Sequence, residues 1–342
     1  MVAEEQRAVR VGMVGGRPGA GIAETHRTAM RLDDRYVLVA GVFSRDREKS
    51  LAAARRLRIS ENRGYPDYVA MATAESKRED RIEAVSMVTQ ANSHYEIAKR
   101  FLEADIHVVC NKPLCLLVAE AKELNALAEK GGLIPCLMHS YSGCAMVRHA
   151  ARMVRNGDLG GIRVVQAEHA SGWAAKLLER EGCPQAARRT DPSLLRDASV
   201  LYDLGTHAHQ LARFITGLEV TEVAAELSRI ISGRVIKDNA NLLLRFSNGV
   251  RGTLWASMAA VDNEHGLRIR VYGDRCSLAW RHEDPHHLHY CSIDGPPQFL
   301  AQGADWLSPD ACRWTRVGLG HPKGFFEAFA NLYTKGSGCA AR

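Results

Sequence analysis

The sequence predicts an α/β protein of two domains. The first is a doubly wound parallel sheet, and the second is an α+β domain with an open-faced, mainly antiparallel sheet. The chain has 342 residues, enough for two domains of roughly 100–200 residues each. Short apolar runs alternate with helical patterns over residues 1–140, which is typical of a parallel sheet. Residues 141–342 contain longer strand-like runs with few helices between them, which favours antiparallel pairing.

Five short apolar runs predict the strands of the first domain, because strands buried on both faces are continuously apolar. They cover residues 9–15, 36–43, 82–89, 106–110 and 133–138. Helical patterns between them cover residues 22–32, 48–57, 94–104 and 118–130.

The second domain begins with a predicted helix over residues 146–155, which ends at the C-cap signal Asn156-Gly157. Strands are predicted over residues 162–169, 220–228, 239–246, 252–258, 267–272 and 276–280, and helices over residues 206–215 and 324–333. Asn248-Gly249 predicts a hairpin turn between two of these strands. Residues 171–199 are expected to be irregular and residues 285–315 to be rich in loops.

Composition excludes several classes of protein. The net charge is +6, but the 45 Lys and Arg are scattered among 39 acidic residues, which disfavours a nucleic-acid partner. No apolar run is long enough to cross a membrane, and residues 1–10 do not form a signal peptide. The nine cysteines contain no C-x-x-C pair, which indicates reduced thiols rather than a zinc or disulfide framework. We therefore expect a cytoplasmic protein with no membrane partner.

A glycine-rich turn joins the first predicted strand to the first predicted helix. Backbone that approaches without side chains, followed by a helix N-terminus, is what a dinucleotide pyrophosphate requires. The residues expected to contact such a cofactor are Gly15, Gly16, Pro18, Gly19 and Ala20. The spacing is not a regular G-x-G-x-x-G, because the loop is a residue or two longer.

The end of the second predicted strand bears on the choice of cofactor. An acid there would bind the ribose of NAD, and an arginine would favour the 2′-phosphate of NADP. The sequence has Ser44 at this position, followed by Arg45 and Asp46. We expect NAD as the cofactor, with NADP as an alternative, and count Ser44 and Arg45 among the cofactor-binding residues.

Two further patterns contain groups suited to proton transfer. Lys112 follows the fourth predicted strand, and ligands of open α/β sheets bind at the carboxyl ends of strands. Asp203 and His207 are four residues apart at the start of a predicted helix, so they would share one face. His207 and His209 are only two apart and do not share a helix face, so no metal is expected.

Together these motifs resemble the Gfo/Idh/MocA family of oxidoreductases, named after glucose–fructose oxidoreductase and inositol dehydrogenase. The glycine loop, Lys112-Pro113 and the D-x-G-x-H pattern from Asp203 to His207 occur in the family's order over nearly the whole chain. The resemblance implies a Rossmann domain over residues 1–140 and a substrate-binding and oligomerisation domain over residues 141–342. It also implies hydride transfer between NAD or NADP and a secondary hydroxyl or ketone of a sugar or cyclitol.

The resemblance implies roles for individual residues. Lys112, Asp203 and His207 fall on the catalytic positions, and Thr89, Asn92, His94, Asn111 and Lys112 on cofactor-binding ones. Further segments resemble the branch of levoglucosan dehydrogenase and glycoside 3-dehydrogenases. The substrate-binding candidates are Tyr141, Trp173, Arg189, Asp191, Asp203, His207, Asn239 and His321. Asn111 departs from the family, which has an acid before the lysine.

The expected reaction follows from these assignments. His207 is the expected base, since an unperturbed histidine pKa of about 6.5 suits proton exchange near neutrality. Lys112 would stabilise negative charge on the reacting oxygen, and Asp203 would orient the substrate or His207. The sequence leaves open which of Lys112 and His207 takes the proton first. The predicted site lies between the two domains.

The predicted substrate is a sugar, glycoside or anhydrosugar, and the predicted assembly is a homodimer or homotetramer through the second domain's sheet. An inositol or aminocyclitol dehydrogenase is one alternative. A non-catalytic, cofactor-binding regulator is an alternative of another class, although such a protein would be expected to lack Lys112 or His207.

Overall fold

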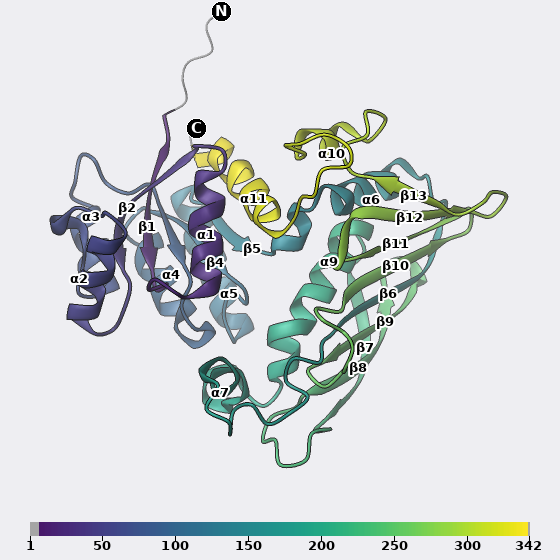
Figure 1. Cartoon of the computed structure of the whole chain (residues 1–342), viewed down its shortest axis with the longest axis horizontal. Helices are drawn as coiled ribbons and strands as arrows, with labels where there is room; N and C mark the ends of the chain where they lie inside the picture. Colours follow the sequence, from purple (N-terminus) through teal and green to yellow (C-terminus); the bar gives the residue numbers. More distant parts are fainter. Residues whose placement is uncertain (1–6, 341–342) are drawn as a thin grey trace, which may run out of the picture. The chain divides into compact units, whose positions relative to one another are not determined.

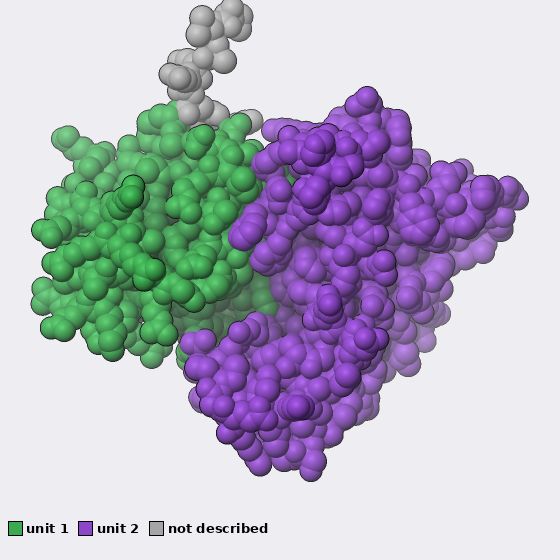
Figure 2. Space-filling model, in the orientation of Figure 1, with its two compact units in different colours: residues 1–138, 329–342 green, residues 139–328 purple. Residues whose placement is uncertain are grey.

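The computed structural model describes residues 7–340, with side chains through residue 336. Contacts divide the chain into two compact units (Figure 2). One unit takes in the residues up to Met138 and those from Phe329 onward, and the other consists of His139–Ala328.

The first unit contains a five-stranded parallel sheet in the order β2-β1-β3-β4-β5. Its strands are β1 Val9–Val14, β2 Tyr36–Val42, β3 Ala84–Met87, β4 His107–Asn111 and β5 Pro135–Met138. All five predicted strands are confirmed, although β3 is shorter than expected. Because β2 and β3 lie on opposite sides of β1, the strand order reverses there, which is where open α/β sheets bind ligands.

Helices cover this sheet in the alternating pattern that the sequence predicts. They are α1 Gly21–Arg31, α2 Arg47–Arg56, α3 Tyr68–Glu75, α4 His94–Leu102 and α5 Val118–Gly131, with short 3₁₀ turns at Glu61–Arg63 and Ala91–Ser93. The sequence did not predict α3. It is only 8 residues long, too short for a clear helical period, and Asp67 caps it by accepting a hydrogen bond from the Ala70 N–H at 2.7 Å.

The C-terminal helix α11, Phe325–Ala340, extends beyond the predicted residues 324–333. Its later part belongs to the first unit, whereas residues 141–342 were expected to form the second domain. The reason is a buried polar contact. The Tyr333 hydroxyl lies 2.7 Å from His26 Nδ1 and 3.0 Å from Ser86 Oγ. Burial lowers the pKa of His26 to about 3, so the imidazole is neutral and suited to this contact.

The second unit contains an eight-stranded sheet in the order β13-β12-β11-β10-β6-β9-β8-β7. Its strands are β6 Ile162–Ala170, β7 Val220–Ser228, β8 Asn239–Phe246, β9 Arg251–Ser257, β10 Leu267–Gly273, β11 Cys276–Arg281, β12 Asp284–Ser292 and β13 Gln298–Ala301. Neighbours are antiparallel except β6 and β9. The predicted turn between β8 and β9 is confirmed, with Asn248 and Gly249 at positive φ (63° and 77°).

Helices α6 (Ala145–Asn156) and α9 (Thr206–Thr216) cover one face of this sheet (Figure 1). Side chains alternate along each strand, so Val165, Ala167 and His169 of β6 are buried beneath the helices. Gln166 and Glu168 point to the opposite face. The core thus lies between the helices and one face of the sheet.

Two segments contain more regular structure than the sequence predicts. Residues 285–315 contain most of β12, all of β13 and α10 (Pro309–Arg313), so the prediction of a loop-rich segment was wrong there. Within Asp284–Ser292, Leu288 is the aliphatic residue buried in the core, among histidines and a proline, so the strand pattern is faint. Residues 171–199 contain the short helices α7 (Pro184–Thr190) and α8 (Pro192–Leu195). Among the described residues, none of the helices is long and apolar enough to span a membrane.

Candidate active site

The turn between β1 and α1 has a conformation that requires glycine. Gly15 and Gly16 have φ of +87° and +77°, a region that residues with a side chain rarely occupy. A Cβ on Gly16 would lie 2.5 Å from the Cβ of Ala23. Arg27 holds the turn from α1, where its Nη1 donates a hydrogen bond to the Gly16 carbonyl at 2.7 Å. The turn is therefore fixed close to the helix.

Open space lies before the first residues of α1. A Cβ on Gly19 or Gly21 would meet no atom within 4 Å. The Gly19 N–H donates to the Glu24 carboxylate at 2.8 Å, which shows that this N–H is directed toward an anionic group. Glu24 is exposed and can move aside. Pro18 and Ala20 complete the turn, and Ala20 immediately precedes the helix. This geometry fits a pyrophosphate at a helix N-terminus.

At the end of β2, the polar side chains are used locally. Ser44 Oγ accepts a hydrogen bond from the Asp46 N–H at 3.2 Å. Asp46 caps α2 through the Lys49 N–H at 3.1 Å, and hydrogen bonds from Lys49 lower the pKa of this carboxyl. Arg45 is exposed beside them. The carboxylate of Asp46, which is the acid nearest the end of β2, is thus engaged in capping the helix.

The loops after β3 and β4 are joined by His94, the first residue of α4. Its Nδ1 lies 2.6 Å from the Pro113 carbonyl and its Nε2 lies 3.2 Å from the Thr89 carbonyl. Burial lowers the pKa of this imidazole. A neutral imidazole has one N–H, so His94 donates a hydrogen bond to one of these carbonyls and lies against the other. It thereby links the two loops, a contact that the family resemblance did not specify. Of the other predicted residues here, Asn92 is exposed, and Asn111 and Lys112 at the end of β4 are half-buried.

The second unit brings Asp203 and His207 together with two predicted substrate-binding residues. Asp203 lies in a π-helical turn, Leu201–Gly205, that continues into α9, and both Asp203 and His207 are buried. Arg189 Nε of α7 pairs with Asp203 Oδ2 at 2.8 Å. The guanidinium also lies 4.9 Å from the ring centre of Trp173, within the range of a cation–π contact. The negative charge of Asp203 is therefore balanced.

Rings surround His207, and sequence analysis identified only one of them. Tyr141, in the 3₁₀ turn Ser140–Gly143, has its ring centre 4.8 Å from that of His207. The rings of His169 and His139 lie 5.5 and 5.9 Å away. These histidines are far apart in the sequence and form no motif, so a single sequence offers no signal for them. Among the residues with described side chains, no group could hold a metal ion.

Three predicted substrate-binding residues do not join this group. Asp191 caps α8, where its Oδ1 accepts hydrogen bonds from the N–H of Ser193 at 2.9 Å and from its hydroxyl at 2.7 Å. Asn239 lies on the sheet face opposite α9, and its Oδ1 accepts a hydrogen bond from Trp255 Nε1 at 3.0 Å. His321 is exposed in the loop before α11.

Comparison with known proteins identifies both units. Residues 9–139 match the oxidoreductase family with an NAD-binding Rossmann fold, and residues 147–279 match the Gfo/Idh/MocA C-terminal domain. The chain belongs to the Gfo/Idh/MocA family. It is an oxidoreductase of the NAD-binding type, so the resemblance that the motifs indicate is confirmed.

Individual relatives support this assignment. The chain is 35% identical over 334 residues to the uncharacterised oxidoreductase YfiI of Bacillus subtilis (strain 168), covering 96% of this chain and 84% of that protein. An inositol dehydrogenase homologue from Azotobacter vinelandii, solved with NADH and myo-inositol, has a TM-score of 0.91 at 32% identity, covering 98% and 86%. Levoglucosan dehydrogenase with NADH and levoglucosan has a TM-score of 0.83 at 21% identity, covering 98% and 89%, and thus shares the fold.

Proposed function

We propose that this Gfo/Idh/MocA oxidoreductase transfers hydride between NAD and a secondary hydroxyl, or the corresponding ketone, of a sugar, glycoside or anhydrosugar. The observation that carries the proposal is the buried pair of His207 and Asp203, with the half-buried Arg189 paired to Asp203. It places a proton acceptor beside a fixed ion pair that can hydrogen-bond several hydroxyls.

A cyclitol is the second candidate substrate. It is favoured by the Azotobacter vinelandii homologue, which binds myo-inositol and is 32% identical to this chain. A ring that carries only secondary hydroxyls would need the same proton acceptor, His207, and the same hydrogen-bonding group, Arg189.

The proposed residue roles divide between cofactor and substrate. The glycine turn with Pro18 and Ala20, the loops that contain Ser44, Arg45, Thr89, Asn92 and His94, and Asn111 with Lys112 would hold the cofactor. NAD supplies the hydride acceptor when bound. Tyr141, Trp173 and Arg189 would bind the substrate, and His207 would take the hydroxyl proton. Lys112 would hydrogen-bond the reacting oxygen as negative charge develops on it.

A panel of substrates tests the proposal directly. The full chain is mixed with NAD and each of a set of anhydrosugars, glycosides, aldoses and cyclitols, and NADH formation is followed by absorbance. We expect turnover with at least one cyclic polyol. No turnover with any of them, although NAD binds, would support the non-catalytic regulator instead.

Gly21→Asp should weaken NAD binding by about tenfold or more, because it adds a carboxylate at the helix N-terminus where the pyrophosphate would bind. An acid in the first turn favours the helix itself, so the melting temperature should be unchanged or higher. Gly21→Asn is the matched neutral control. Fluorescence titration measures the affinity. Equal NAD affinity in the two variants would show that the pyrophosphate does not bind at this turn.

We expect a higher kcat/KM with NAD than with NADP, and some turnover with both. Arg45 is exposed at the end of β2, where it can meet a 2′-phosphate. Arg45→Ala should therefore reduce turnover with NADP and leave turnover with NAD unchanged. A preference for NADP above about tenfold in the wild type, or about 1.4 kcal/mol, would contradict the assignment of NAD.

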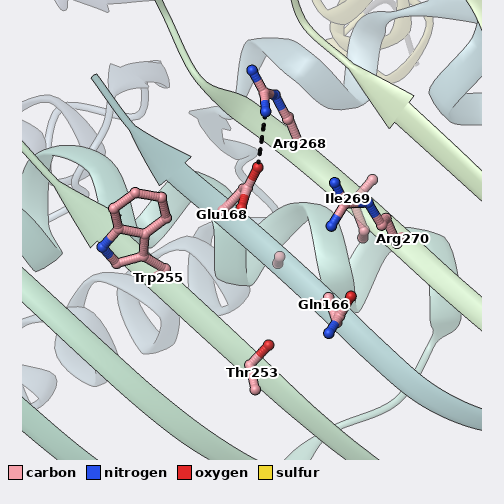
Figure 3. A pocket seen from close by; sticks show the side chains of 8 residues that line it. Gln166, Glu168, Thr253, Trp255, Arg268, Ile269 and Arg270 are labelled. Atoms are coloured by element: carbon pink, nitrogen blue, oxygen red, sulfur yellow. Dashed lines mark ion pairs between the residues drawn. The ribbon is translucent and has the colours of Figure 1, made fainter. Parts of the chain in front are cut away.

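The uncovered face of the eight-stranded sheet is the proposed contact between copies of the chain in a homodimer or homotetramer. Leu243 and Phe299 are 66% and 70% exposed there. A shallow pocket also lies on this face, where Trp255 of β9 stands near the ion pair of Glu168 and Arg268 (Figure 3). Exposed apolar side chains on the open face of a sheet are typical of a protein contact. Leu243→Glu should dissociate the assembly into single chains, which light scattering would detect as a lower molar mass.

We also propose a cytoplasmic location. No disulfide joins the cysteines whose side chains are described, as expected for a reducing compartment.

A further inference from the structure

A cluster of rings packs around His207 and Tyr141, and the proposed reaction uses only these two of its members. Tyr141 packs against His207, and its ring centre lies 5.5 Å from that of His265. The ring of His265 in turn lies 4.2 Å from that of His282. His207 and Tyr141 are buried, whereas His265 and His282 are half-buried. His282 also contacts Tyr141 directly, with ring centres 5.0 Å apart, so both outer histidines pack against the ring that contacts the base.

A hydrogen bond fixes Tyr141 to His265. The Tyr141 hydroxyl lies 2.8 Å from His265 Nε2. Burial raises the pKa of the Tyr141 phenol well above its usual value, so the phenol stays protonated and can donate a hydrogen bond to Nε2. The Tyr141 ring meets the His207 imidazole edge to face, at 78°. Movement of the hydroxyl would therefore also move the ring edge that contacts His207.

His265 also supports a second ring that contacts His207. It stacks on His169, with ring centres 4.7 Å apart and planes at 17°. His169 Nδ1 lies 3.2 Å from the Leu204 carbonyl in the π turn before His207. The loop carrying His265 is tied to Glu283, whose carboxylate accepts a hydrogen bond from the Gly266 N–H. His265 is thus held in place while it contacts two of the rings around the base.

We propose that His265 is a positioning residue, which holds Tyr141 and His169 against His207 so that the base keeps one orientation toward the substrate. This inference rests on the proposed role of His207. A fixed orientation matters because a displacement of about 1 Å can lower a rate by about 10². His265 itself transfers no proton in this proposal.

Two substitutions of His265 separate its hydrogen bond from its ring. His265→Gln keeps a group that can bond to the Tyr141 hydroxyl, while His265→Phe keeps a stacked ring and removes the nitrogen. We expect kcat to fall about tenfold or more in His265→Phe and less than about threefold in His265→Gln, with KM for NAD unchanged in both. Tyr141→Phe should lower kcat similarly, and the double variant Tyr141→Phe/His265→Phe should be no slower than the slower single variant.

His149→Gln is the matched control, because His149 is a buried histidine of the same unit that hydrogen-bonds Ser308 and lies on α6. It should keep wild-type kcat even if the melting temperature falls. Equal kcat in wild type and His265→Phe would overturn the proposal. So would additive losses in the double variant, or equal losses in His265→Phe, His265→Gln and His149→Gln.

A measurement without substrate separates this inference from the proposed function. In the full chain with ¹⁵N-labelled histidine, the two ring nitrogens of His207 should give well-separated signals, because a fixed ring keeps one tautomer. The signals are assigned with a His207→Gln sample. His265→Phe should bring them together, as the ring samples both tautomers, and His149→Gln should not. Unchanged His207 signals in His265→Phe would overturn the inference even if turnover is observed, and changed signals would support it even if the substrate panel fails.

Discussion

His207→Ala should lower kcat by roughly 10²–10⁴ while NAD binds as in the wild type. His207 is buried in α9 beside Tyr141, and Asp203 lies in the turn that leads into this helix. Removal of the imidazole leaves the hydroxyl proton with no positioned acceptor, whereas the residues proposed to bind NAD belong to the first unit. Steady-state kinetics measures kcat, and fluorescence titration measures the affinity for NAD.

His209→Ala is the matched control for this prediction. His209 lies two residues further along α9 but is exposed, so its removal changes the same helix without touching the rings around His207. We expect wild-type turnover in this variant. If His207→Ala turned over a true substrate at the wild-type rate, His207 would not be the base, and Lys112 would become the candidate for that role.

The sequence predicts the parts of the fold that depend on local pattern. Continuous apolar runs identified all five strands of the first sheet, and the turn at Asn248-Gly249 fixed the hairpin between β8 and β9. The pattern failed at β12, where histidines stand on a strand that is defined by pairing with β11 and β13. Strand pairing between distant segments is a tertiary property, so propensity alone does not show it.

The residues of the candidate site fall into the same two groups: those that a local motif indicates, and those that only the folded chain brings together. Lys112 and His207 were identified because they occur in motifs with a fixed place relative to a strand or a helix. The histidines at positions 139, 169, 265 and 282 come from separate segments of the chain, and only the folded sheet brings their rings together. Asn239 is the opposite case. It occurs in a family-like segment, but the alternation of side chains along β8 turns it away from α9.

Lys112→Met should lower kcat by about 10²-fold, because it removes the donor proposed to stabilise negative charge on the reacting oxygen and keeps the length of the side chain. Lys112 directly follows β4, and the Asn111 before it carries no charge. Lys112→Arg keeps the positive charge and should recover part of the rate if charge alone is important, but little if the single ammonium must reach one oxygen. If Lys112 and His207 act on the same hydroxyl, the double variant Lys112→Met/His207→Ala should lose much less than the product of the two single losses. Fully multiplicative losses would show that the two residues act independently, and wild-type kcat in Lys112→Met would remove the lysine from the mechanism.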